Sequence, residues 1–70
     1  MNEDLKDLKE RTYARASIFT RNVELRLRDT GGLLADAPLE FLPPSVDKDD
    51  AEALQDWFLE EYGDEVRALL

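Results

Sequence analysis

The chain has 70 residues, with 9 Lys and Arg against 17 Asp and Glu, a net charge of −8, and no cysteine or histidine. The composition excludes disulfides, thiolate catalysis and histidine-based catalysis or metal binding, and the charge opposes direct binding to nucleic acids or anionic membranes. Residues 1–70 make one small domain. Because a core of this size supplies only about 3–5 kcal/mol, we expect a homodimer or a chain that folds fully on a partner.

The charge is concentrated in the second part of the chain. Residues 1–29 carry seven Lys and Arg against six Asp and Glu, for a net charge of +1, whereas residues 30–70 carry two against eleven, for −9. Like charges crowded on a small domain repel each other. We therefore expect that a basic surface on the same chain, a basic protein surface of a partner or a salt-rich environment offsets this charge. The acidic N-terminus is unlike a signal peptide, and no apolar run reaches the ~20 residues of a membrane span, so we expect a cytoplasmic protein.

Residues 3–28 have the periodicity of an amphipathic helix. Apolar and small residues recur at steps of three and four, which places them on one helical stripe. These residues are Leu5, Leu8, Thr12, Ala16, Phe19, Val23 and Leu27. Asn2 is suited to cap the start of the helix, and Gly31–Gly32 to end it.

A rival interpretation takes residues 22–28 as a strand, because Val23, Leu25 and Leu27 alternate with polar residues. Residues 29–32 would then form a turn and residues 33–41 the returning strand. Two properties favour the helix: Glu, Leu and Arg are good helix formers, and Pro38 confines the second strand to a sheet edge.

The second half predicts an apolar connection at residues 30–45, which folds back and buries Leu39, Phe41 and Leu42. The diproline after Leu42 prevents a helix from running through. A second helix is predicted at about residues 46–69, capped by Ser45 or Asp47 and with a break at Gly63. Its apolar face consists of Ala51, Leu54, Phe58, Leu59, Tyr62, Val66 and Leu69.

The predicted fold is all-α: a helix–loop–helix, that is, an antiparallel helical hairpin, which dimerisation would complete to a four-helix bundle. The alternative fold is α+β in the order α-β-β-α, with a hairpin at residues 22–41. Ile18 and Leu25, which lie off the main stripe of the first helix, would form a second patch for self-association.

Four acidic residues form a row at helical spacing: Glu52, Asp56, Glu60 and Asp64. Like charges at i,i+4 oppose helix formation by about 0.2–0.5 kcal/mol per pair, so the row is either a solvated face or a docking surface for a basic partner. Trp57 at the margin of the apolar face would be a half-exposed anchor for that partner. The predicted contact residues are Glu52, Asp56, Trp57, Glu60, Glu61, Asp64 and Glu65.

The sequence predicts no enzyme, no cofactor and no metal site. Residues 47–52 begin like a calcium loop, but Ala51 stands where a ligand is needed and Glu52 where a glycine is needed. The predicted function is a small acidic protein-binding module, an inhibitor or adaptor that docks on a basic protein. One alternative is a DNA-mimicking inhibitor, because the acids of residues 47–65 would follow each other along a helix at about the phosphate spacing of DNA. Another is a structural subunit of a larger complex with salt-adapted acidity.

Overall fold

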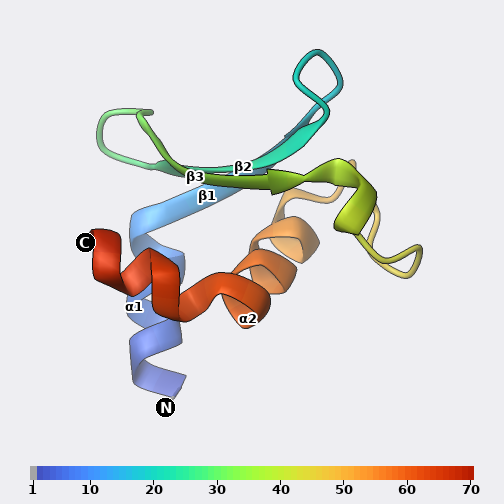
Figure 1. Cartoon of the computed structure of the whole chain (residues 1–70). Helices are drawn as coiled ribbons and strands as arrows, with labels where there is room; N and C mark the ends of the chain where they lie inside the picture. Colours follow the sequence, from blue (N-terminus) through green and yellow to red (C-terminus); the bar gives the residue numbers. More distant parts are fainter. Residues whose placement is uncertain (1) are drawn as a thin grey trace.

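A three-stranded antiparallel sheet, covered on one face by two helices, forms the protein in the computed structural model (Figure 1). The structure describes residues 2–70, with side chains from residue 6 onward. The elements follow in the order α1 (Asn2–Arg11), β1 (Thr12–Ser17), β2 (Asn22–Leu27), β3 (Leu33–Pro38), the 3-10 turn η1 (Leu39–Phe41) and α2 (Ala51–Leu69). The sheet has the order β1-β2-β3, so β2 is its central strand.

The predicted all-α helical hairpin is wrong, because residues 3–28 contain most of a short helix and two complete strands. A step of four residues fits one helical turn, but it is also two periods of a strand. Thr12 and Ala16 therefore share one face of β1, just as Val23 and Leu27 share one face of β2, and their spacing fits both structures. The turn at residues 18–21 separates the strands, with Arg21 in the left-handed region at φ 58°.

The rival hairpin at residues 22–41 coincides with β2 and β3, but the α-β-β-α order lacked β1. Its returning strand was also drawn too long, since residues 39–41 form η1. Gly31 adopts φ 73° in the turn between the strands and donates its backbone N–H to the Leu27 carbonyl at 2.9 Å. Glycine adopts this conformation without the steric cost that a side chain would bring.

The inner face of the sheet, which faces α2, is lined by small and aliphatic side chains. Strand pairing aligns Ala14 with Leu25 and Ala16 with Val23, and on the other side of β2 Ala37 with Val23. The alanines let α2 approach the sheet closely, and its large side chains fill the space above them. The buried apolar core consists of Leu8, Ala14, Val23, Leu25, Ala37, Leu54, Trp57, Phe58, Leu59 and Val66.

Helix α2 begins later than the sequence predicted and bends within its length. Its N-cap is Asp50, whose side chain accepts a hydrogen bond from the Ala53 N–H at 3.1 Å. Neither Ser45 nor Asp47 caps the helix; Asp47 instead accepts from the Asp49 N–H at 2.9 Å in the preceding loop. The predicted break at Gly63 lies one residue earlier, at Tyr62, where φ −128° and ψ 20° are not helical.

The apolar connection predicted at residues 30–45 is buried only in part. Leu39 and Leu42 are half-buried beside the core, but Phe41 is 59% exposed. The predicted capping by Asn2 and the predicted packing of Leu5 concern side chains before residue 6, which the structure does not describe. Among residues 2–70, no helix combines the length and the apolar character that crossing a bilayer requires.

Candidate functional site: the acidic face of helix α2

The six carboxylates predicted to contact a partner are all exposed on α2, and we call them the acidic face. They are Glu52, Asp56, Glu60, Glu61, Asp64 and Glu65. The opposite side of the helix faces the sheet, because Leu54, Phe58 and Leu59 are buried there. The burial of the apolar side thus directs these carboxylates to solvent.

The bend at Tyr62 divides the acidic face into two segments. Glu52, Asp56 and Glu60 precede the bend, whereas Asp64 lies beyond it. A straight helix is needed to hold four residues at i,i+4 on one ridge, so the predicted row does not continue through Asp64. The phosphate-like spacing behind the DNA-mimic alternative also requires a regular rise along the helix. The DNA-mimic alternative stays a prediction, and the bend at Tyr62 interrupts the regular rise that it needs.

Lys9 of α1 partly neutralises the first segment. Its Nζ lies 2.7 Å from Asp56 Oδ1. The hydrogen bond from Lys9 to Asp56, together with the negative charge of Asp56, raises the pKa of Lys9 above its ordinary value of 10.5. Lys9 lies in the last turn of α1, which presents it to α2. A small hollow of about 310 Å³ beside this ion pair is lined by Lys9, Asp56, Leu59 and Glu60.

The region around the bend has the least compensation. Within the part of the chain whose side chains are described, Glu60, Glu61 and Glu65 form no ion pair. Asp64 meets Arg67 at 3.6 Å, in an exposed i,i+3 contact, and such contacts contribute little. The acidic face is therefore most negative at residues 60–65.

Trp57 is not the half-exposed anchor that the sequence predicted. Its exposed fraction is only 9%, and its ring meets those of Phe58 and Tyr62 edge to face, with centroids at 6.1 and 5.9 Å. Edge-to-face geometry is favourable for aromatic rings, so the indole belongs to the core. A side chain so covered offers a partner little surface.

The acidic face has no obvious catalytic geometry. Between residues 6 and 70, no three acidic side chains converge to form a group that could hold a metal ion. The hollow beside Lys9 and Asp56 is only partly enclosed, whereas active sites are generally enclosed clefts.

Sequence reasoning missed a second surface feature, because it assigned Phe19 and Phe41 to the core. Phe19 is 94% exposed, in the turn between β1 and β2, and Phe41 is exposed in η1. Ile18 was predicted to form a surface patch with Leu25; Ile18 is exposed, but Leu25 is fully buried. The alternation of small and polar residues through Thr12–Ser17 was the available signal for β1, and hence for a turn carrying Ile18 and Phe19.

Comparisons of the chain with models of protein families, with curated proteins and with solved structures find no match.

Proposed function

We propose that the protein is a small binding module, an inhibitor or adaptor, that docks the acidic face of α2 on a basic surface of a protein partner. The observation that carries the proposal is the group Glu60, Glu61 and Glu65, three exposed carboxylates around the bend that lack ion-pair partners among the described residues. A basic surface would neutralise them without breaking any contact within the described part of the protein.

Electrostatic complementarity of this kind mainly accelerates association and selects the partner. Lys9 and Asp56 form a fixed ion pair at the edge of the surface, so we assign the main contact to residues 60–65. A cytoplasmic location remains part of the proposal, as the sequence predicts.

The test compares the wild-type chain with the triple variant Glu60→Gln/Glu61→Gln/Glu65→Gln. A matched control, Glu10→Gln/Asp29→Asn/Asp49→Asn, removes the same charge from exposed side chains outside the acidic face. The three chains serve as baits in a lysate of the source organism. Any basic protein retained by the wild type is then purified and titrated by calorimetry at low and high salt.

We expect the triple variant to bind at least about tenfold more weakly, equivalent to about 1.4 kcal/mol, and the control to bind nearly as the wild type does. The wild-type affinity should fall as salt rises. Equal weakening by the two variants would show a dependence on net charge alone and would contradict the proposal. Adding duplex DNA to the titration tests the DNA-mimic alternative, since a mimic and DNA would compete for one site.

A further inference from the structure

An apolar surface lies where the β1–β2 turn meets η1, on elements other than the helix that carries the acidic face. The β1–β2 turn carries Ile18 and Phe19, and η1 carries Leu39 and Phe41; Ile18 and Leu39 line one groove between these two segments, and we call the two segments together the apolar end. The Leu39 N–H donates to the Arg21 carbonyl at 2.9 Å, which holds η1 against this turn. Ile18 is 69% exposed. Three of the largest exposed apolar side chains of the described protein are thus gathered on two adjacent segments.

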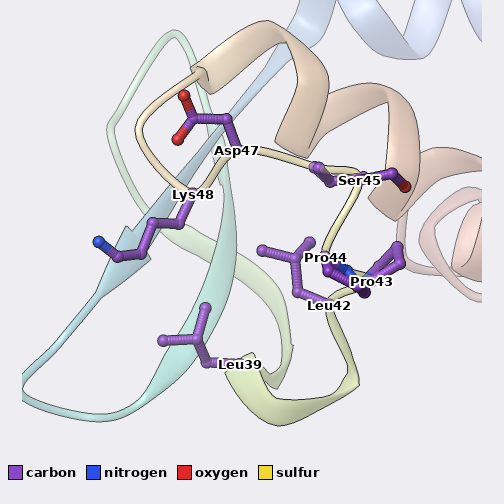
Figure 2. A pocket seen from close by; sticks show the side chains of 8 residues that line it. Leu39, Leu42, Pro43, Pro44, Ser45, Asp47 and Lys48 are labelled. Carbon is purple, nitrogen blue, oxygen red and sulfur yellow. The ribbon is translucent and has the colours of Figure 1, made fainter.

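The apolar end is hollowed rather than flat. A groove of about 440 Å³ is lined by Ile18, Arg21, Leu39 and Glu40. A neighbouring hollow of about 520 Å³ shares Leu39 and continues along the loop after η1, where Leu42 and the diproline line it (Figure 2). The surface can therefore receive side chains of a partner.

The charges of the apolar end balance each other. Arg21 and Glu40 both line the groove, and neither makes an ion pair within the described part of the chain. Residues 18–21 and 39–41 together carry one positive and one negative side chain, whereas the whole chain has a net charge of −8. Two copies of so acidic a protein repel each other least where the local charge is zero.

We propose that the apolar end is the interface of a homodimer, in which Arg21 of each copy faces Glu40 of the other. A two-fold axis places identical patches against each other, so the patch has to be complementary to itself. A cation and an anion beside an apolar centre meet this requirement, and Phe19 and Phe41 are the side chains that leave water. The dimer does not depend on the proposed function, and none of the residues of the apolar end belongs to the acidic face.

This interface replaces the dimer expected from the sequence. Pairing two helical hairpins required an apolar stripe on each helix, but the apolar side of α2 is already covered by the sheet. Among the side chains that the structure describes, six large apolar ones remain exposed: Ile18, Phe19, Leu33, Phe41, Leu69 and Leu70. Of these six, Ile18, Phe19 and Phe41 lie in the apolar end.

Sedimentation equilibrium of the full chain, from micromolar to millimolar concentration, tests the proposal. We expect the mass to rise with concentration from 8.1 kDa towards twice that value. Phe19→Ser should raise the dissociation constant about tenfold or more, as does the loss of a central interface aromatic. Leu33→Ser is the control, because Leu33 is 52% exposed but lies outside the apolar end. A chain that stays monomeric to millimolar concentration, or equal effects of both variants, would overturn the proposal.

Charge reversal tests the predicted pairing of Arg21 with Glu40. Arg21→Glu and Glu40→Arg should each associate about tenfold or more weakly than the wild type, because each places like charges opposite each other twice. An equimolar mixture should regain dimers, since each copy then meets the opposite charge in the other. Circular dichroism verifies that both variants are folded. A mixture that does not associate better than its components would overturn the arrangement.

Discussion

The two faces of the sheet achieve burial in different ways. The inner face is covered by α2, and Val23 and Leu25 of the central strand are completely inaccessible there. The outer face has no element of the described chain packed over it, yet Glu24 is only 7% exposed. Glu24 Oε1 accepts from Arg26 Nε at 3.0 Å and lies 3.3 Å from Arg15 Nε. The long arginine side chains cover the carboxylate, so neighbouring side chains can bury a group that no helix or strand covers.

The largest expected effect belongs to the inner face. Leu25→Ala should lower the free energy of unfolding by about 2–5 kcal/mol, because it removes buried methyl groups and leaves a cavity under α2. Such a loss is a large share of the total stability of a small domain. Urea denaturation followed by circular dichroism measures it. Leu33→Ala, at an exposed position of β3, should stay within about 0.5 kcal/mol; similar losses from both variants would contradict the assignment of the core.

A substitution of Gln55 tests whether hydrogen bonds are what allow a polar side chain to be buried between α2 and the inner face of the sheet. The buried Gln55 Nε2 donates to the Lys9 carbonyl at 3.0 Å and to the carbonyl and Oγ1 of Thr12 at 2.8 and 3.0 Å. It thus ties α2 to the junction of α1 and β1. Gln55→Ala should cost about 1–3 kcal/mol, because these buried acceptors lose their donor. Glu52→Ala, one turn earlier and exposed, is the control in the same denaturation assay, and an equal loss there would refute this role.

The variant Glu24→Gln measures how much the ion pairs on the outer face contribute to the free energy of unfolding. The substitution keeps the shape of the side chain but replaces charge-assisted hydrogen bonds by weaker neutral ones, so we expect a loss of about 1 kcal/mol. Asp36→Asn provides the matched control, since Asp36 is exposed on the same face and, from side chains within residues 6–70, accepts only from Asn22 Nδ2, at 3.1 Å. That control should change stability by less than about 0.5 kcal/mol. If Glu24→Gln were equally silent, the arginines would cover the carboxylate without stabilising it.

The smallest effect is expected where both partners are exposed, at Lys9 and Asp56. Asp56 raises the pKa of Lys9 above 10.5, so the ion pair contributes its stability below that pH and loses it as the pH rises through the raised pKa. The difference in melting temperature between the wild type and Lys9→Gln should therefore be constant near neutral pH and vanish in strong alkali. Lys6→Gln, an exposed substitution on the same helix, is the control. A difference that persisted at high pH would contradict this origin.

The sequence alone determined the features that depend on local chemistry. The long C-terminal helix follows from its periodicity: Leu54, Phe58, Leu59 and Val66 were assigned to its apolar side and are buried. The exposure of the acidic face follows equally, because a helix that buries one side turns the opposite side to water. The bend at Tyr62 lies next to the residue where the sequence placed a break.

Only the tertiary structure decided between helix and sheet for residues 12–27, because steps of four fit both periods and the local pattern could not separate them. Whether these residues form a helix or strands depends on α2, about forty residues away in the sequence. The large side chains of α2 pack over Ala14, and its Gln55 donates a hydrogen bond to the Thr12 carbonyl. The same long-range packing buried Trp57 and Leu25 and left Phe19 and Phe41 in water. Burial depends on which surfaces meet, and a single side chain's hydrophobicity carries no information about its distant neighbours.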